Sequence, residues 1–417
     1  MGEPFILARS GHPISRRDID PDALKILYRL YRLGFTAYLC GGAVRDLILG
    51  RPPKDFDIVT DARPGQIKRC FHNVYIIGRR FRLAHIHFHG GKTIEVATFR
   101  RNPEGCEEKA PEVKIDPKNA YGTPCDDAFR RDITINALFY DAATGSVLDY
   151  TGGIEDLAHR LVRIIGDPAE RFTEDPVRIW RVVRHAARLQ FGIEEATERA
   201  IPQLRHLLAE CSGARLYEEL NKDLAYDKTR PVIEALRRYH LLRFVLGQPG
   251  EDYETNPDIF SRLCSLLEIE DKAKASGCVP SLVEMYAVVF WPWMEPLFAA
   301  ARGDMHVILK NALATAGTKA TLPRNLRADV IQTMIIAGRL VQALRSGQMR
   351  WSLKQRPHYA PASQLLFLIE KGRPQEAGES FESLFRQAFP SAPTSRPRRR
   401  RRHRHFRNPQ TGPISSS

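Results

Sequence analysis

The chain has 417 residues, 43% of them hydrophobic and 27% charged, which is the composition of a folded protein with more than one hydrophobic core. It contains no apolar run of about eighteen residues, which argues against a membrane span, and residues 1–10 lack the features of a secretory signal. The formal net charge of +14 and the pI of about 9.6 favour a polyanionic partner, with nucleic acid ahead of an acidic membrane surface.

The first part of the chain predicts a small α/β unit. A helix is expected over 20–33, where the pair Asp20-Pro21 is a good helix start. A strand over 36–40 leads through two glycines into a helix over 43–49, and a strand over 56–60 precedes a helix over 64–71. Further strands are expected at 74–77, 83–88, 93–99, 133–140 and 147–150. The polar segment 101–126 contains several prolines and predicts a mobile loop.

Beyond residue 168 strand signals become rare and helical patterns dominate. Helices are expected over 175–189, 204–208, 214–224, 232–242, 259–267, 282–290 and 326–344. From residue 390 the chain is rich in Pro, Ser and Arg and cannot form a core, so a disordered tail is expected. The predicted fold class is α+β, with a small mixed β-sheet and helices in an N-terminal head and an all-α remainder. The predicted domains are a head at 1–160, a helical neck at 161–225, a helical body at 226–389 and a basic tail at 390–417.

The cysteines form no metal-binding or disulfide pattern in the sequence. Their number, seven, is odd, and no two stand at C-x-x-C spacing, so neither a zinc ribbon nor a disulfide framework is expected. They are Cys40, Cys70, Cys106, Cys125, Cys211, Cys264 and Cys278. Burial of each thiol in a reducing, cytoplasmic protein is the simplest interpretation.

Three acidic residues of the head predict a metal centre. Asp55 and Asp57 stand at i and i+2 in a predicted strand, so their side chains point to one face about 6–7 Å apart. Carboxylates that close repel one another unless cations lie between them, and two Mg²⁺ ions about 3.5–4 Å apart would satisfy both. Glu95 becomes a third ligand if its own predicted strand neighbours Asp57. Two aspartates at this spacing are more often a solvated loop end, so the residues around them decide whether a metal site is the better interpretation.

The turn before these aspartates has the character of a phosphate-binding turn. Gly41 and Gly42 lie between a predicted strand and a predicted helix, where a backbone without side chains lets a phosphate approach closely. The helix that follows would direct its N–H groups toward a triphosphate, and Arg45 can add a charged contact. Glycine turn, arginine and aspartate pair within residues 41–57 are far more specific together than any one of them alone.

With these motifs the sequence resembles the class II nucleotidyltransferases, the family of bacterial poly(A) polymerases and CCA-adding enzymes. The resemblance covers residues 12–224. Its motifs are Gly41-Gly42-x-Val44-Arg45-Asp46-x-x-Leu49-Gly50 with Asp55-x-Asp57, Arg130-Arg131-Asp132-Ile133-Thr134-Ile135-Asn136-Ala137, Asp149-Tyr150-x-Gly152-Gly153-x-x-Asp156-Leu157, Glu174-Asp175-Pro176-Val177-Arg178 and Arg184-x-Ala186-Ala187-Arg188-Leu189. The resemblance implies a nucleotidyltransferase head, a neck with nucleotide- and RNA-binding elements and an RNA-binding body.

The resemblance also implies roles for single residues. Asp55, Asp57 and Glu95 are expected to be catalytic, with two Mg²⁺ ions held by the aspartates. Nucleotide binding is implied for Gly41, Gly42, Arg45, Arg131, Asp132, Asn136, Asp175, Arg178 and Arg188.

Within this set, Asp175 and Arg178 are three residues apart on a predicted helix and are implied to read the incoming base in place of a Watson–Crick partner. Without the other motifs, the same two residues would be an ordinary surface ion pair. Arg131, Asp132 and Asn136 are expected to contact ribose and phosphate or to support the residues that do. Arg188 is expected to support the helix pair.

The choice between the two activities of this family rests on other segments. Residues 12–19, 78–85 and 94–100 resemble the poly(A) polymerase branch, as does the arginine-rich C-terminus. The run Arg398, Arg399, Arg400, Arg401 and Arg402 is predicted to bind RNA phosphates whatever the RNA sequence, the alternative being a solvated charge run or a weak electrostatic tether. The expected reaction is addition of AMP from ATP to the 3′ ends of mRNA, structured RNA or tRNA.

Two alternatives stay open. Cys40 and residues 351–390 depart from the poly(A) polymerase pattern, which leaves an enzyme that adds CCA, or part of it, to tRNA. A non-enzymatic RNA-binding adaptor with a degenerate head is the third hypothesis. It would require a broken glycine turn or aspartate pair, and neither is broken here.

Two further features have both a functional and a structural interpretation. His85, His87 and His89 alternate along a predicted strand as zinc ligands can, but no cysteine or acid completes a tetrahedral set, so a structural or solvent-facing role is favoured. The cluster Phe290-Trp291-Pro292-Trp293 could stack RNA bases, although packing between helices is the simpler interpretation.

Overall fold

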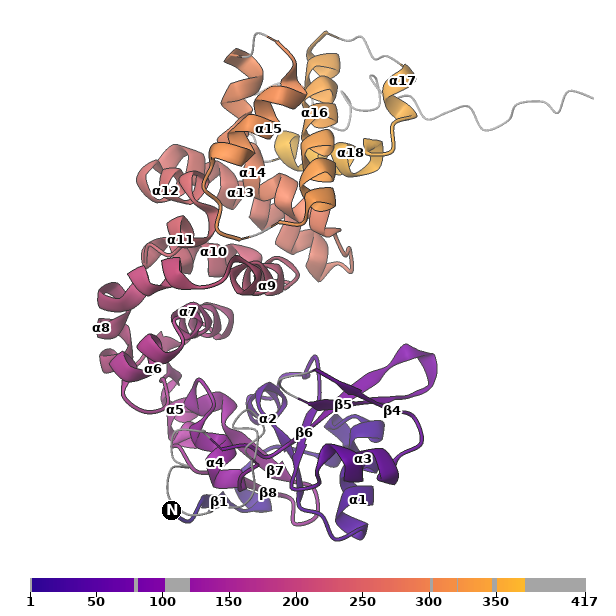
Figure 1. The fold of residues 1–417 in the computed structure, drawn as a ribbon, viewed down its shortest axis with the longest axis vertical. Helices are drawn as coiled ribbons and strands as arrows, with labels where there is room; N and C mark the ends of the chain where they lie inside the picture. Colours follow the sequence, from indigo (N-terminus) through magenta and orange to yellow (C-terminus); the bar gives the residue numbers. More distant parts are fainter. Residues whose placement is uncertain are drawn as a thin grey trace, which may run out of the picture.

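The computed structural model describes residues 2–78, 82–101, 121–300, 303–320, 322–346 and 351–371. A mixed α+β head, at the bottom of Figure 1, is followed by an almost wholly helical part that rises away from it. This confirms the predicted fold class. The predicted disordered tail at 390–417 lies outside the described residues.

The head contains eight strands and five α-helices within its described residues. In chain order they are β1 Phe5–Leu7, α1 Pro21–Arg32, β2 Ala37–Cys40, α2 Gly42–Ile48, β3 Asp57–Thr60, α3 Pro64–Cys70, β4 Val74–Ile77, β5 Leu83–His87, β6 Thr93–Thr98, α4 Pro124–Phe129, β7 Leu138–Asp141, β8 Ser146–Asp149 and α5 Gly153–His159.

A short parallel pair of strands and a series of helices follow the head. They are β9 Leu161–Val162, α6 Pro168–Glu174, α7 Val177–Leu189, β10 Gly192–Ile193, α8 Glu195–Leu204, α9 Gly213–Leu224, α10 Thr229–Arg238, α11 Leu242–Leu246, α12 Gln248–Thr255, α13 Pro257–Ala275, α14 Leu282–Ala300, α15 Met305–Thr315, α16 Arg324–Ser346, α17 Trp351–Lys354 and α18 Tyr359–Lys371.

The eight strands of the head form one sheet in the order β1-β8-β7-β2-β3-β6-β5-β4. Neighbouring strands are antiparallel except β3 and β6, which are parallel, so the sheet is mixed. Strand β1 was not predicted from the sequence, because this strand of three residues lies at the sheet edge and, among the described residues, pairs only with β8, far away in the chain.

The two faces of this sheet have different surroundings. Leu39, Ile58 and Val96 point to the face that packs against α1 and α3 and belong to the main hydrophobic core. Cys40 and Val59, on the same strands as Leu39 and Ile58, point to the opposite face and belong to a second, smaller core. We call the sheet face that carries Cys40 and Val59 the open face. Because side chains alternate along each strand, the strand register shows which other residues point to this face.

Helix α1 shows how local sequence decides a boundary. The Asp20 carboxylate caps the helix by accepting hydrogen bonds from the N–H groups of Asp22 at 2.8 Å and Ala23 at 3.3 Å, and Pro21 occupies the first helical position. The predicted helix start is confirmed.

The predicted strand over 133–140 is wrong in its first half. Residues Thr134–Asn136 form a 3₁₀ turn, and the strand begins only at Leu138. The Thr134 hydroxyl donates to the buried Asp156 carboxylate at 2.6 Å, and a Cβ on Gly153 would lie 2.4 Å from the Thr134 carbonyl oxygen. A tertiary contact with α5 therefore imposes this turn on residues whose local pattern favours a strand.

The predicted loop over 101–126 is wrong at its end, because α4 begins at Pro124. Its start is a capping box, in which the side chains of Thr123 and Asp126 each bond to the backbone N–H of the other residue. Residues 102–120, including Cys106, lie outside the described residues.

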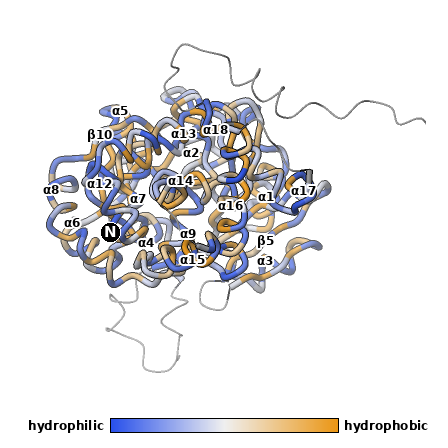
Figure 2. Tube along the Cα trace, turned by 90° about the horizontal axis from the view of Figure 1, so that it is seen from above, coloured by the Kyte–Doolittle hydropathy of each residue, from blue (hydrophilic) through white to orange (hydrophobic). Residues whose placement is uncertain are grey.

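The body is held together by apolar helix contacts. Apolar residues, orange in Figure 2, are dense in α16, whereas the outlying α8 and α17 are mostly hydrophilic. Phe290 and Trp291 are buried in α14, and the indole N–H of Trp293 donates to Asp252 at 2.7 Å, so packing accounts for the aromatic cluster.

The helix predicted over 232–242 ends early, at Arg238, because His240 takes a left-handed φ of 55°. Among the described residues no helix has both the length and the apolar character to cross a bilayer.

Candidate active site

The turn between β2 and α2 requires glycine. Gly41 has φ 72° and ψ −139°, a backbone conformation that only glycine adopts readily. Its N–H donates to the Leu138 carbonyl at 3.2 Å, and a Cβ at this position would lie 3.3 Å from the Arg131 guanidinium. The glycine corner is therefore tied to the residues around Arg131 and Asn136.

Replacing Gly41 by Ala is expected to destabilise the protein by about 1–3 kcal/mol, because the new methyl group is forced into a strained backbone conformation beside Arg131. Chemical denaturation of the variant gives the free energy of unfolding. Gly65→Ala is the matched control, since Gly65 is helical with open space around it and gains helix propensity. Equal stability of the two variants would contradict the argument.

The acidic residues lie on β3, on the segment just before it and on β6. Strand β3 begins at Asp57, so Asp55 lies before the strand, and the expectation that both aspartates belong to it is wrong. Strands β3 and β6 pair in parallel with Ile58 opposite Val96, which places Asp57 beside Glu95 on the open face. The structure thus brings Asp57 and Glu95 together, as the sequence predicts.

The negative charge of Asp57 is only partly compensated, since Arg131 attracts it while Glu95 and Asp55 repel it. Partial desolvation by the surrounding protein, reinforced by the nearby charge of Glu95, raises the pKa of Asp57 to about 6, although its side chain remains accessible to solvent. Neither the Asp55 nor the Asp57 side chain has a hydrogen-bond or ion-pair partner among the described residues. Within those same residues, no three His, Cys, Asp or Glu side chains converge into a ready-made metal site. The aspartates would therefore need phosphates or water to complete a cation's coordination.

Glu95 has a partner of its own, since its Oε1 lies 3.3 Å from Nε2 of His85 on the neighbouring strand. The expected strand of alternating histidines is only partly correct. His89 lies beyond β5 in a 3₁₀ turn, and Nδ1 of His87 is 2.9 Å from the Thr93 hydroxyl. These contacts hold the imidazoles against the sheet.

Arg45 is turned inward. It is almost buried, its Nη1 donates to the Asn136 side chain at 2.6 Å, and its Nε donates to Asp46 at 2.9 Å. The Asn136 amide in turn lies 3.4 Å from the His185 ring of α7. Burial, with the surrounding positive charges, holds the pKa of His185 well below 6.5, so this ring is neutral. Arg45 thus links the glycine corner to α7, and its expected phosphate contact stays a prediction.

Arg131 and Asp132 lie side by side in the chain but serve different partners. The Arg131 guanidinium donates to Asp127 at 3.0 Å and to the Asn136 carbonyl at 3.1 Å. The Asp132 carboxylate accepts from Arg178 at 3.0 Å and from Arg181 at 2.6 Å, both on α7. Asp132 is thus a bridge between the head and the first long helix after it.

Asp175 and Arg178 do not share a helix face, contrary to the prediction. Helix α6 ends at Glu174, Asp175 is its extended C-cap, and α7 starts at Val177 after a proline. Asp175 pairs instead with Arg215 of α9 at 2.8 Å. A proline between the two residues prevents one continuous helix here. Both side chains remain at the α6–α7 junction, so their role in reading the base stays a prediction.

The contact between α7 and α9 depends on a buried ion-pair network that the sequence analysis did not identify. Asp223 of α9 is fully buried and accepts from Trp180 at 2.7 Å, Arg184 at 2.5 Å and Arg188 at 3.0 Å. Glu219 accepts from Arg181 and Arg184. Burial alone would raise the pKa of Glu219, but the two arginines lower it to about 2.

Arg188 therefore supports the helix pair, as the sequence predicts. Carboxylates four residues apart on α9 facing arginines on α7 were the available sequence signal for this network, but their pairing depends on the tertiary fold.

A pocket of about 390 Å³ lies between the open face and α7. Val59 and Ala97 line it from the sheet, and His185 lines it from α7. Its wall also carries charged residues, the four arginines Arg100, Arg130, Arg131 and Arg181 and the two aspartates Asp127 and Asp132. This excess of positive charge, on the same face as Asp57, suits a polyphosphate.

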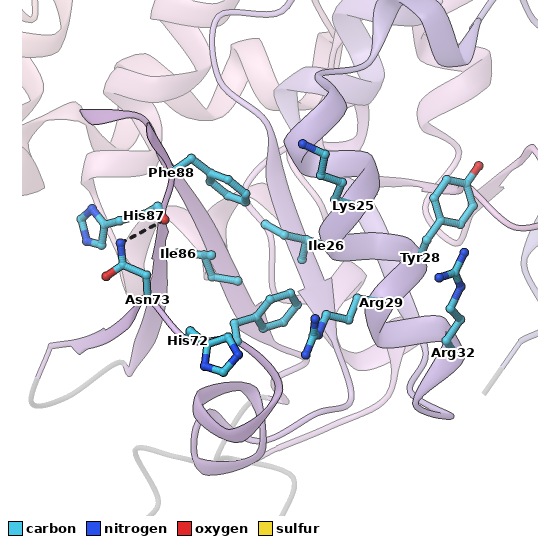
Figure 3. A pocket seen from close by; sticks show the side chains of 11 residues that line it. Lys25, Ile26, Tyr28, Arg29, Arg32, His72, Asn73, Ile86, His87 and Phe88 are labelled. Atoms are coloured by element: carbon cyan, nitrogen blue, oxygen red, sulfur yellow. Dashed lines mark hydrogen bonds between the residues drawn. The ribbon is translucent and has the colours of Figure 1, made fainter. Parts of the chain in front are cut away.

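A larger hollow, of about 520 Å³, lies on the other side of the sheet and is not the candidate site. It is lined by α1, the α3–β4 turn and the end of β5, with Ile26, Ile86 and Phe88 facing into it, and no carboxylate lines it (Figure 3). The larger of these two cavities therefore lacks the residues expected of a nucleotide site. The smaller pocket has both the motif residues and the proximity to Asp57.

The arginines Arg398–Arg402 lie outside the described residues, and their predicted RNA binding stays a prediction.

Comparisons with known proteins agree with this geometry. Residues 37–163 match the family described as Poly A polymerase head domain, and residues 190–252 match the one described as Probable RNA and SrmB- binding site of polymerase A. Poly(A) polymerase I of Salmonella typhimurium is 37% identical over 386 residues, which is 87% of this chain and 81% of that protein. A CCA-adding enzyme of Lactobacillus helveticus is 38% identical over 205 residues, 49% of this chain and 50% of that protein.

Solved structures show the same fold. The Bacillus stearothermophilus CCA-adding enzyme in complex with CTP aligns with a TM-score of 0.59 at 25% identity, over 88% of this chain and 82% of that one. Among the residues recognised by motif, Gly41, Asp57 and Glu95 lie on neighbouring elements of the shared fold, and the chain belongs to the nucleotidyltransferase family of poly(A) polymerases and CCA-adding enzymes.

Proposed function

We propose that this protein is a template-independent polynucleotide adenylyltransferase, a poly(A) polymerase that adds AMP from ATP to RNA 3′ ends. One observation carries the proposal. The Asp57 side chain, which has no hydrogen-bond or ion-pair partner among the described residues, lies on the open face of the sheet beside the glycine corner, with Asp55 just before the strand and a pocket with four arginines in its wall on the same face. Such a site accepts a triphosphate and a cation together, whereas an RNA-binding module needs only the positive charge.

Enzymes of this family use nucleoside triphosphates and divalent metal ions. The residues present fit such an ion, because Asp57 lies beside Glu95 and its pKa is raised to about 6 by desolvation and by the charges of Glu95 and Asp55, despite the nearby Arg131. We assign Asp55 and Asp57 as holders of two Mg²⁺ ions, with Glu95 as the further candidate. When bound, the ions would neutralise the triphosphate and activate the RNA 3′-hydroxyl.

The side chains of the pocket suggest how the reaction proceeds. Arg130 and Arg131 can hold the phosphates, and the bare backbone at Gly41 permits their close approach. The RNA 3′-hydroxyl would then attack the α-phosphate in line, releasing pyrophosphate without a covalent enzyme intermediate. Positioning and charge neutralisation are sufficient for this chemistry.

We propose that Asp175 and Arg178 select adenine. Arg178 bonds to Asp132 and to the Arg171 carbonyl, and Asp175 bonds to Arg215. These contacts preorganise both side chains, and their remaining donors and acceptors would be left for an incoming base. A hydrogen-bonding site of this kind rejects a base whose donors and acceptors are reversed.

The alternatives are less well supported. The CCA-adding relative of Lactobacillus helveticus matches about half of this chain, whereas the poly(A) polymerase of Salmonella typhimurium matches most of it, body included. Against the adaptor hypothesis, the glycine corner and both aspartates are intact.

The test is to offer ATP and CTP, each alone and both together, to a tRNA that lacks CCA and to an unstructured RNA. The expected result is long A-tracts from ATP on both RNAs and little incorporation of CTP. Termination after CCA, or after a single A on a CC end, would select the tRNA enzyme. Equal, negligible incorporation by the wild type, Asp55→Ala and Asp57→Ala would favour the adaptor.

Other proposals concern the organisation of the whole chain. We propose the division into head 1–160, neck 161–225, body 226–389 and tail 390–417, with Arg398–Arg402 gripping RNA phosphates whatever the RNA sequence. The cytoplasmic location expected from the cysteines stays a prediction.

A further inference from the structure

A row of aligned side chains leads from the catalytic aspartate to the edge of the sheet. Tyr75 on β4 is directly opposite His85 on β5, and His85 is directly opposite Glu95 on β6. The parallel register of β6 and β3 continues the row to Asp57. Directly opposed residues on neighbouring strands project from the same face, so Tyr75 shares the open face with the candidate active site.

The outer end of this row is an exposed aromatic surface. Tyr75 is 60% exposed and Ile77, the next residue of β4 on this face, is 47% exposed. Alternate residues Val74 and Ile76 pack against the main core, so the exposure is confined to the open face. Strands β4 and β5 lie in the upper part of the head in Figure 1. Exposed apolar side chains on an edge strand invite unwanted pairing, and a functional partner explains their presence.

The Tyr75 ring is held in place. It meets the His87 ring edge to face, with ring centroids 5.1 Å apart, and His87 is itself anchored by the Thr93 hydroxyl at 2.9 Å. Figure 3 shows the His87 ring pointing away from the hollow that Ile86 and Phe88 line, which agrees with its place on the open face. A ring fixed in this way loses little entropy when a flat ligand stacks on it.

From these observations we propose that Tyr75 is a stacking platform for single-stranded RNA a few nucleotides upstream of its 3′ end. The inference rests on the proposed function. Three strand spacings of about 4.8 Å separate Tyr75 from Asp57, about 14 Å in total. Bases stacked about 3.4 Å apart would cover this distance in about four nucleotides. A base in the RNA primer therefore reaches Tyr75 while the 3′-hydroxyl lies at Asp57.

RNA suits this surface better than a protein partner does. Arg82 is exposed just before β5, close to the row. The arginine-lined pocket adjoins the row at Leu83. Stacking on an aromatic ring does not depend on the base, as an enzyme that extends RNAs of different sequence requires. An apolar protein partner would bury these guanidinium groups at a cost in desolvation.

The test compares Tyr75→Ala with wild type on oligoadenylate primers of three and ten nucleotides at saturating ATP. Loss of one stacked base is expected to raise KM for the ten-nucleotide primer about five-fold or more and to leave kcat within about two-fold. The three-nucleotide primer does not reach Tyr75, so its kinetics stay unchanged. Tyr75→Phe retains the ring and is expected to match wild type.

Tyr31→Ala is the matched control, because Tyr31 is 62% exposed on α1, which packs on the opposite face of the sheet. Equal effects of Tyr75→Ala on both primers, or an equal effect of Tyr31→Ala, would overturn the proposal. If wild type extends neither primer, the proposed function fails instead. Fluorescence anisotropy with labelled ten-nucleotide oligoadenylate then still tests the platform, since unchanged affinity in Tyr75→Ala would contradict it.

Discussion

Asp57→Asn is expected to reduce AMP incorporation by about 10³-fold or more while leaving the fold intact. The Asp57 side chain has no hydrogen-bond or ion-pair partner among the described residues, so the substitution breaks no side-chain hydrogen bond or ion pair there. What it removes is the negative charge that would hold a cation against the triphosphate, and such charge stabilisation contributes several kcal/mol to the transition state. The measurement is the single-turnover rate of AMP addition to a radiolabelled RNA.

Stability distinguishes this loss from misfolding. Desolvation and the charges of Glu95 and Asp55 outweigh the attraction of Arg131 for the Asp57 carboxylate, so the neutral variant should have a thermal midpoint no lower than that of wild type in metal-free buffer. Mg²⁺ with ATP should raise the midpoint of wild type and leave that of the variant nearly unchanged. Glu155→Gln, at an exposed position on α5, is the control for a lost carboxylate. Activity of Asp57→Asn within ten-fold of wild type would exclude Asp57 as a metal holder.

Asp223→Ala is expected to destabilise the protein by about 3–5 kcal/mol. The variant leaves Arg184 as a buried cation with one carboxylate fewer, and it leaves the Trp180 indole N–H without its acceptor. Removing one member of a buried ion pair exposes the full desolvation cost of the other. Urea denaturation followed by tryptophan fluorescence measures the loss, since Trp180 lies within the network.

Two further variants test whether the loss of stability in Asp223→Ala comes from the buried ion-pair network. Glu218→Ala removes a carboxylate that is exposed on the same helix, and its effect should stay within about 0.5 kcal/mol. Asp223→Asn keeps one oxygen that can accept from Trp180, so its loss should be smaller than that of Asp223→Ala. Similar stabilities for Asp223→Ala and Glu218→Ala would show that the network contributes little to the α7–α9 contact.

Local sequence was sufficient to predict a helix or strand wherever the signal for that element lies within a few residues. The cap at Asp20 marks the start of α1, and the strand predicted at 74–77 has the bounds of β4. Gly41 and Gly42 are followed by a helix, as their pattern indicates. Each of these depends on backbone conformation or on hydrogen bonds between near neighbours in the chain.

Local sequence failed where a distant residue decides the conformation. The pattern at 133–140 favours a strand, yet the Thr134–Asp156 hydrogen bond and the close approach of Gly153 impose a turn. Asp175 and Arg178 have helical spacing, yet a proline separates their helices and Arg215 takes Asp175 as its partner. Propensity is outweighed when a buried polar group must find its partner.

The amino-acid sequence by itself determined the chemistry of this protein: its glycine corner, its aspartate pair, its excess of arginine and the family it resembles. Only the tertiary structure decided which of these groups meet. Asp132 reaches Arg181 across 49 positions of the chain, and the row from Asp57 to Tyr75 exists because four strands pair in one register. The reason is physical, since strand register and helix packing are set by burying the apolar faces of distant segments together, and no local pattern encodes that choice.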